Sequence, residues 1–501
     1  MELDSPLGST TLITETDPDY QRRWWILAVL AIAQLMVILD ASVINIALYS
    51  AQRALHFSND NRQWVISGYA LAFGSLLLVG GRIGDLFGRK RTFIAGAVGF
   101  ALASVVGGSA RSFTVLVSAR VLQGVFAALL APAALSILST TFTDAKERGR
   151  AFGIWGTITG AGGALGLLIG GLLTQELSWR WTMFINAPLA VVAGTGAMAL
   201  LHSHQHSVRP KIDWLGTVTA SAGLFALVFG FSHAETHGWS SSTTLAFIAA
   251  GVILLTAFVF IQSRSKHPLL PLRIVLDRNR GGAFLSLAVV GAAIFAVFLF
   301  LVYYLQQILG FSPIKCGLAT MPMAIGMIAA AAITTTLLLP RFGPRPLVAP
   351  GMLIAAAGMA LLTQLGVHST YVGGVLPALV IAGFGLGTVL APTLNIATAG
   401  IEPGDSGVAS ALANTMQQVG GSLGIALLAT LGASAASSYL IGKAPTPANL
   451  AEAAVHSYTT AWAWAAGILA VGAVATFLLM RGDAPHLQPG FEAEEAFIPP
   501  L

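Results

Sequence analysis

The sequence predicts an all-α integral membrane protein, from its low charge content and its abundance of apolar residues. Only 9% of the 501 residues are charged, whereas soluble globular chains contain about 25%. Apolar residues make up 55% of the chain, and about 20 apolar residues in a helix cross the ~30 Å core of a bilayer. The composition therefore excludes a water-soluble enzyme and provides for on the order of a dozen spans.

Apolar stretches of helical length alternate along the chain with polar loops and with loops rich in glycine and proline. We expect fourteen transmembrane helices, at residues 24–49, 63–81, 92–110, 113–140, 149–174, 183–201, 214–231, 243–262, 282–305, 316–339, 346–366, 373–397, 407–433 and 458–480. An even number of spans places both termini on the same side of the membrane.

The positive charges indicate which side this is. Nineteen Lys and Arg residues lie on the side of the termini and six on the other side. Because cytoplasmic loops hold the excess of Lys and Arg, we expect both termini in the cytoplasm. The first 20 residues contain five acids and no Lys or Arg, unlike a secretory signal. The abundance of glycine and alanine favours a bacterial source, and thus a multi-pass protein of the bacterial plasma membrane.

Short sequence matches at a nearly constant spacing indicate an internal repeat, the usual architecture of secondary transporters. The GGALG of residues 162–166 returns as GGSLG 258 residues later, and the LAP of residues 130–132 returns 260 residues later. Two weaker matches, Phe57-Ser58 and Gly88-Arg89, return at 254 to 256 residues. The predicted organisation is a cytoplasmic tail (1–23), a six-helix bundle (24–205), two additional helices (206–265), a second six-helix bundle (266–480) and a cytoplasmic tail (481–501).

The loop after the second predicted helix has a distinctive sequence, GRIGDLFGRKR. Its Gly81 and Gly88 allow a tight turn, and Asp85 can pair with Arg89 or Lys90 across it. A cytoplasmic anchor of positive charges alone would not explain the glycine and aspartate spacing. The chain here resembles the major facilitator superfamily, whose loop between helices two and three has this G-x-x-x-D-x-x-G-R-K pattern. The resemblance implies that Asp85 and Arg89 latch the inward- and outward-facing states.

Further motifs resemble the fourteen-helix drug:proton antiporter family within that superfamily. They are LDASV at 39–43, RVLQG at 120–124, SWRW at 178–181 with Phe184, Asn186 and Pro188, and DWLG at 213–216. The resemblance implies a monomeric major facilitator fold, with fourteen helices as two six-helix bundles plus two extra helices. It also implies proton-coupled export of hydrophobic or amphiphilic drugs by alternating access.

The fifth predicted helix departs from the antiporter motif of this family, G-P-x-x-G-G. It keeps Gly162, Gly166, Gly170 and Gly171, but Leu167 stands where the family has proline. The glycines still predict close helix packing, whereas the bend linked to the proline is not expected.

Two ionisable residues, Asp40 and Arg120, lie deep within predicted spans, where a charge costs ~2.5–3.5 kcal/mol or more. The helical rise of ~1.5 Å per residue places both in the outer half of the membrane. Burial favours the neutral form of a carboxyl group, and a nearby arginine favours the ionised form. We therefore hypothesise that Asp40 carries the proton, and the resemblance gives Arg120 a role in that step. The alternative is a purely structural salt bridge.

Polar and aromatic side chains inside predicted spans are candidates for a substrate cavity, or alternatively for hydrogen bonds between helices. They are Asn45, Tyr69, Tyr303, Asn395, Asn414 and Gln417. Residues 316–339 and 407–431 contain no acid. The sequence therefore provides few carboxylates to face a dication, and we expect monocationic, neutral or weakly acidic amphiphiles as substrates at least as readily.

Other functions are less well supported by the sequence. All ten histidines are expected in loops or tails, which argues against an intramembrane histidine enzyme or a metal site. The sequence has no Walker motif, so the proton gradient rather than ATP or a cofactor is the expected energy source. Dispersed basic residues argue against nucleic acid as a partner. The alternatives are a proton-coupled carrier of one metabolite, such as a self-made antibiotic or a nutrient, and a membrane-embedded enzyme or sensor.

Overall fold

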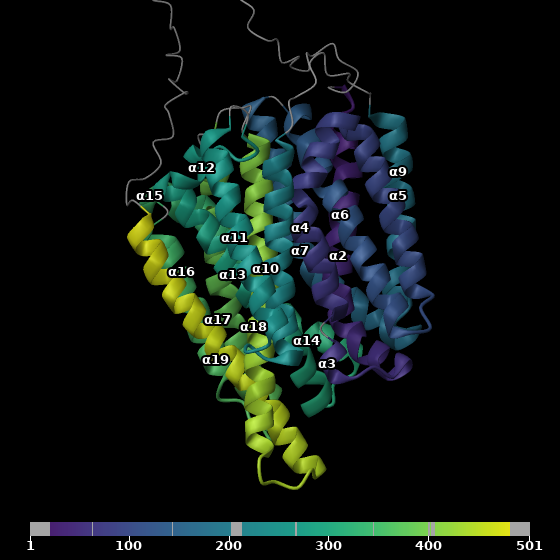
Figure 1. The fold of residues 1–501 in the computed structure, drawn as a ribbon, viewed down its shortest axis with the longest axis vertical. Coiled ribbons are helices and arrows are strands. Elements are labelled where there is room, and N and C mark those ends of the chain that lie inside the picture. Colours follow the sequence, from purple (N-terminus) through teal and green to yellow (C-terminus); the bar gives the residue numbers. More distant parts are fainter. Residues whose placement is uncertain are drawn as a thin grey trace, which may run out of the picture.

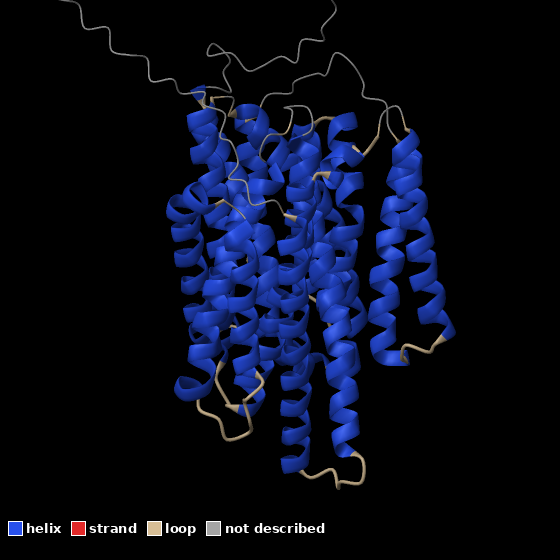
Figure 2. Cartoon of the chain, turned by 90° about the vertical axis from the view of Figure 1, so that its left-hand side faces the viewer, coloured by secondary structure: helices blue, strands red, loops and turns tan. Residues whose placement is uncertain are grey.

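The computed structural model describes residues 21–62, 64–142, 144–201, 213–265, 268–343, 345–398, 401 and 406–480. Residues 1–20 of the predicted tail 1–23, the whole predicted tail 481–501, and the side chains of Asp85 and Asn395 lie outside the described residues. Throughout the described ranges the regular elements are all helical, as Figure 2 shows.

The first half of the chain forms a bundle of long helices, drawn purple to blue in Figure 1. They are α2 (Arg23–Leu55), α4 (Trp64–Phe87), α5 (Arg89–Gly108), α6 (Phe113–Thr141), α7 (Ala145–Glu176) and α9 (Asn186–Leu200), with short α3 (Asn59–Arg62) and α8 (Trp181–Phe184). A hairpin of α10 (Trp214–His237) and α11 (Ser242–Arg264) follows. Helix α10 packs on α4 and α18, and α11 packs on α10.

The second half begins after the short α12 (Leu272–Leu276). Its helices are α13 (Arg278–Tyr303) with η1 (Tyr304–Ile308), α14 (Pro313–Ile333) with η2 (Thr334–Leu338) and α15 (Leu339–Phe342), α16 (Arg345–Leu362), η3 (Tyr371–Val375) with α17 (Leu376–Thr398), α18 (Ser406–Leu440) and α19 (Pro447–Leu479).

Each predicted range overlaps a helix or a run of consecutive helical segments over most of its length. Twelve of the described helices are long and apolar enough to cross a membrane. Helices α4 and α7 contain shorter apolar stretches, Trp64–Leu77 and Leu165–Glu176. The chain thus has an all-helical membrane architecture, and the number of fourteen spans remains a prediction.

The glycine motif after the second predicted helix is helical on both sides of Gly88, which confines the predicted turn to Gly88 and corrects its placement at Gly81. Helix α4 continues through Phe87, and the chain turns at Gly88, where φ is 92°. A Cβ on Gly80, just before the motif, would overlap the carbonyl oxygen of Ala128 in α6. Close packing on α6 therefore stabilises a helix that glycine propensity alone disfavours.

Helices α18 and α19 also extend beyond their predicted ranges, and their hairpin projects at the lower end of Figure 1. The predicted ends followed hydropathy, but these extensions continue as polar, alanine-rich helix. Thr446 caps α19, and Tyr439 of α18 donates a hydrogen bond to Glu452 of α19. The same extension places His456 in α19, and His233 and His237 lie in α10, so the expectation that all histidines lie in loops was wrong.

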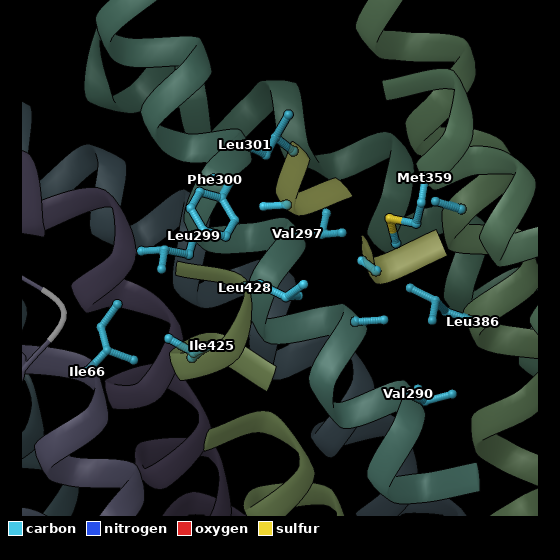
Figure 3. Packing of buried hydrophobic residues seen from close by; sticks show 14 of the residues in the cluster. Ile66, Val290, Val297, Leu299, Phe300, Leu301, Met359, Leu386, Ile425 and Leu428 are labelled. Carbon is cyan, nitrogen blue, oxygen red and sulfur yellow. The ribbon is translucent and has the colours of Figure 1, made fainter. Parts of the chain in front are cut away.

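Apolar packing joins the two halves at the end of the bundle where α2 and α7 finish and α14 begins, called here the far end. One buried cluster includes Ile46 of α2 and Ile66 of α4 together with residues of the second half such as Val297 and Leu301. Figure 3 shows Ile66 in this cluster. A second cluster consists mainly of residues from α2, α4, α5, α6 and α9 of the first half.

Backbone contacts between α7 and α14 close the far end. A Cβ on Gly171 would lie 2.5 Å from the carbonyl oxygen of Pro313, and a Cβ on Gly317 would lie 2.7 Å from that of Leu167. The space between the helices is thus too small for any larger side chain at these two glycines.

Two side-chain contacts reinforce this closure. Gln306 donates a 3.3 Å hydrogen bond to the carbonyl oxygen of Ile46. The guanidinium of Arg62 lies 3.6 Å from the ring centroid of Tyr303, a cation–π contact between the halves.

An ion pair fastens α2 to α7 at the opposite end of the bundle. The Nε and Nη2 atoms of Arg23 each lie 2.7 Å from an oxygen of Glu147. These hydrogen bonds hold the pKa of Glu147 below its ordinary value. The pair therefore stabilises the fold above the ordinary glutamate pKa, and this contribution is lost as pH falls through the lowered pKa.

We expect Gly171→Ala to open the far end. The added methyl group cannot avoid the backbone of Pro313 and Ile314, and overpacking costs about 1–3 kcal/mol. The buried Cys316, the single cysteine of the chain, adjoins this contact and reports its opening. Its labelling by a polar maleimide in nanodiscs should accelerate about tenfold.

Gly163→Ala is the matched control, because a Cβ there meets nothing within 4 Å. It should label at the wild-type rate. Equal labelling of folded Gly171→Ala and wild-type protein would contradict the proposed tight closure.

Candidate functional site

The position of Asp40 is set by glycines of α7 that pack on α2. A Cβ on Gly166 would overlap the hydroxyl of Ser42, and one on Gly162 would lie 3.0 Å from Cγ2 of Ile38. Ser42 and Ile38 are two positions from Asp40, so they lie on roughly the opposite face of the helix. The glycine face of α7 therefore directs Asp40 away from α7 and into the first-half bundle.

Arg120 of α6 meets Asp40 inside this bundle, and both side chains are fully buried. The Nη1 atom of Arg120 lies 2.5 Å from Oδ2 of Asp40, and its Nε donates to the carbonyl oxygen of Val65 at 3.0 Å. A Cβ on Gly124 would overlap the backbone oxygen of Tyr69, so α4 and α6 approach closely one turn from the arginine. The structure thus brings together the two ionisable residues singled out from the sequence.

Three uncharged side chains complete the network around the carboxylate. Gln123 donates to Oδ1 of Asp40 at 2.8 Å, and Asn186 of α9 donates to the same oxygen at 2.7 Å. Both amides also donate to Ser104 of α5, at 2.7 and 3.3 Å. The Oε1 atom of Gln123 accepts from Arg120 at 2.9 Å. Helices α4, α6 and α9 therefore contribute hydrogen-bond partners to the buried ion pair, and α5 contributes Ser104 to the two amides.

Asp40 is the acceptor in every hydrogen bond that the described residues make to its carboxyl group, so the arrangement fits an ionised carboxylate. Arginine has no acceptor, and the amide nitrogens of Gln123 and Asn186 have none either. The ring of Tyr69 lies 4.5 Å from Cζ of Arg120, which adds a cation–π contact. The hydroxyl of Tyr69 is buried and has no hydrogen-bond partner among the described residues.

Gln123, Asn186 and Ser104 were not predicted as site residues. Gln123 and Asn186 are present in the motifs at 120–124 and 178–188, and each is an amide within an apolar run. An uncompensated amide is costly in such a run, and this signal could have identified them. Their convergence on Asp40 depends on helix rotation, which sequence spacing does not determine between different helices.

The predicted loop residues hold the first half together. Lys90 donates to the carbonyl oxygens of Met198 and Leu201, at 3.0 and 2.5 Å, and thus caps the C-terminal end of α9. Arg89 donates to the carbonyl oxygen of Ser136 in α6 at 3.4 Å. These contacts lie within one half of the molecule, and the predicted pairing with Asp85 falls outside the described side chains.

The predicted cavity residues occupy several different places. Tyr69 adjoins Arg120, and Tyr303 contacts Arg62 at the far end. Asn45 donates within its own helix to Ala41 at 3.3 Å. Asn414 and Gln417 lie half-buried in α18, and the side chain of Asn395 is outside the described set. The described contacts therefore do not assemble these residues into one site.

Comparison with known protein families identifies the family to which the chain belongs. The family model of the Major Facilitator Superfamily matches residues 30–425. The chain belongs to this superfamily of transporters.

Among its relatives, the puromycin resistance protein pur8 of Streptomyces alboniger is 45% identical over 92% of both chains. The cephamycin export protein CmcT of Amycolatopsis lactamdurans is 36% identical, over 84% of this chain and 86% of the relative. The tetracenomycin C resistance and export protein of Streptomyces glaucescens is 35% identical, over 82% and 76%. These three relatives are bacterial antibiotic resistance and export proteins.

Solved structures agree with the superfamily fold. The crystal structure of an auto-inhibited POT family peptide transporter has a TM-score of 0.70 at 15% identity, covering 93% of this chain and 98% of that one. An inward-facing bacterial homologue of the human lysosomal transporter Spinster has a TM-score of 0.62 at 17% identity, over 94% and 98%. At these identities the likeness concerns the fold alone.

We expect a strong energetic coupling between Asp40 and Arg120. Asp40→Leu or Arg120→Leu leaves one buried charge without its main partner, which costs about 3–5 kcal/mol. The double variant removes both charges, and its loss of unfolding free energy should be well below the sum of the single losses.

Reversible unfolding in mixed micelles, followed by tryptophan fluorescence, measures these free energies. Gln123→Leu serves as the comparison, with an expected loss of about 1–3 kcal/mol. Strict additivity of the two charge-removing substitutions would show that the pair does not act as a unit.

Proposed function

We propose that this transporter exports a hydrophobic or amphiphilic antibiotic or drug in exchange for protons, by alternating access. The observation that supports the proposal most directly is the buried carboxylate of Asp40, bound by Arg120 inside one half of a transporter fold. The relatives named for puromycin, cephamycin and tetracenomycin C support the substrate class.

The chemistry of Asp40 fits a proton carrier. Burial penalises the ionised carboxylate, and the three donors around it compensate for that penalty. A conformational change that weakens one of these donors, or that admits water from the other side, alters the balance between the two forms. One proton moving down 100 mV supplies ~2.3 kcal/mol, enough to concentrate a substrate more than tenfold.

Alternating access requires that the two halves separate at one end while they close at the other. In the topology we propose, with fourteen spans and both termini in the cytoplasm of a bacterial cell, the closed far end faces outward. The glycine contacts of α7 and α14 then form the outer gate. We further propose that Asp85 and Arg89 act at the cytoplasmic latch, and that the polar residues of α18 face the substrate path.

The range of substrates distinguishes two forms of this proposal. Three of the relatives are each named for one antibiotic, which favours a dedicated exporter over a broad multidrug pump. Expression in an efflux-deficient host, tested against a panel of unrelated toxic compounds, separates the two. Protection against one compound indicates a dedicated exporter, and protection against several indicates a multidrug pump. We propose a monomer that needs no cofactor.

We expect Asp40→Asn to abolish proton-driven transport of puromycin, the probe suggested by the relative at 45% identity. In acid-inside proteoliposomes, wild-type protein should accumulate puromycin above protein-free vesicles, and puromycin should speed the decay of the pH gradient. The amide of Asn cannot take up and release a proton as a carboxyl group does, so the accumulation of puromycin and the faster decay of the pH gradient should both fall to background. Exchange of labelled for unlabelled puromycin without a gradient should persist.

Asp277→Asn is the matched control, because it removes an exposed acid that caps α13. It should transport puromycin at the wild-type rate. If Asp40→Asn retained gradient-driven accumulation at normal expression, Asp40 would not be the proton carrier.

A further inference from the structure

The amide of Asn186 differs from that of Gln123 in one respect. Both amides are fully buried and both donate to Oδ1 of Asp40. The Oε1 atom of Gln123 accepts a hydrogen bond from Arg120, whereas Oδ1 of Asn186 is buried with no partner among the described residues. One amide is therefore fixed at both ends, and the other is fixed at one end only.

Protonation of Asp40 creates a need for an acceptor. A neutral carboxylic acid has an O–H that must donate, yet the groups that contact Asp40 are an arginine and two amide nitrogens, which only donate. A buried O–H without a partner is costly. Among the side chains that bond Asp40, those with an acceptor atom are Gln123 and Asn186, each through its amide oxygen.

The two amides respond differently to this need. A half-turn of the Gln123 amide would direct its NH2 group at the guanidinium of Arg120, so that two donors would face each other. A half-turn of the Asn186 amide breaks no bond at its Oδ1 end. The two ends of an amide are nearly equal in size, which is why their assignment rests on hydrogen bonding, so the turn needs no extra volume.

We propose that Asn186 is a positioning residue for the proton step, whose side-chain amide turns over when Asp40 takes up a proton. The inference rests on the proposed role of Asp40. In the ionised state Nδ2 donates to Asp40. In the neutral state Oδ1 of Asn186 takes that place and accepts the new O–H of Asp40. No covalent bond changes apart from the O–H formed with the incoming proton.

The surroundings of Asn186 allow both orientations. Ser104, which accepts from Nδ2 at 3.3 Å, has a hydroxyl that can donate to Oδ1 after the turn. In the ionised state Oδ1 of Asn186 has no partner, and after the turn Nδ2 has none. The number of buried polar atoms without a partner on this amide is therefore the same in both states. Among the described contacts, the titratable or charged groups close to Asp40 are Arg120 and Tyr69. The structure thus provides the neutral acid with an acceptor that needs no helix movement.

Infrared difference spectroscopy of the full chain in lipid, with ¹³C-labelled asparagine, tests whether the Asn186 amide turns over, and it needs no substrate. Acidification should produce a carboxyl band that is lost in Asp40→Asn. In step with that band, an asparagine side-chain carbonyl band should move to lower frequency, because it gains a hydrogen bond. This band should be missing in Asn186→Leu, and also in Asn186→Ser if the leucine variant does not fold.

Matched substitutions distinguish an Asn186 amide that turns over on protonation of Asp40 from one that keeps its orientation. Gln123→Leu removes a donor from the ionised form only, so the midpoint pH of the Asp40 band should rise by about one unit. Asn186→Leu removes a partner from both forms, so the midpoint should change much less. A rise as large as that of Gln123→Leu, or an asparagine band that stays in place while the carboxyl titrates, would overturn the inference. If no carboxyl band depended on Asp40, the proposed proton carrier itself would fail.

Discussion

The burial of one carboxylate beside one guanidinium is the constraint on which the first half of this molecule depends. Neither Asp40 nor Arg120 is exposed, and removing an ion from water costs several kcal/mol even after relaxation. Amides from two helices bond the carboxylate, and a backbone carbonyl bonds the guanidinium, so these groups offset part of that cost. Helices α2, α4, α6 and α9 must therefore keep their mutual positions for the charges to remain compensated.

Glycine provides the packing that this arrangement needs. Gly166 brings α7 against the face of α2 that lies opposite Asp40, and Gly124 brings α6 against α4 beside Arg120. Gly171, further along α7, meets the backbone of α14 in the other half. Helix α7 therefore contacts both α2, the helix that carries Asp40, and the far-end closure. A shift of α7 is in this way geometrically linked to the surroundings of Asp40 and to the contact between the halves.

The sequence predicted the helices well, because a membrane span requires a long apolar run and little else. It located Asp40 and Arg120 at similar depth, since depth follows from the rise per residue. It did not identify Gln123 and Asn186 as partners, because rotation and tilt are set by packing between helices. The helical extension of α4 through Phe87 was missed for a related reason, as local glycine content suggested a turn that tertiary contacts with α6 override.

The balance of donors and acceptors around Asp40 bears on whether this carboxylate carries a proton, as we propose, or only forms a structural salt bridge. A structural salt bridge is stabilised by partners that suit the ionised pair alone. Gln123 is such a partner, because it donates to Asp40 and accepts from Arg120. A proton carrier must be stable in two states, so at least one partner has to serve both. Asn186 is the described neighbour of Asp40 with a donor engaged and an acceptor still buried and unused. The unsatisfied Oδ1 of Asn186 slightly weakens the state with ionised Asp40 and would stabilise the state with neutral Asp40. The free-energy difference between these two protonation states is therefore smaller, and a change of access has less of it to overcome.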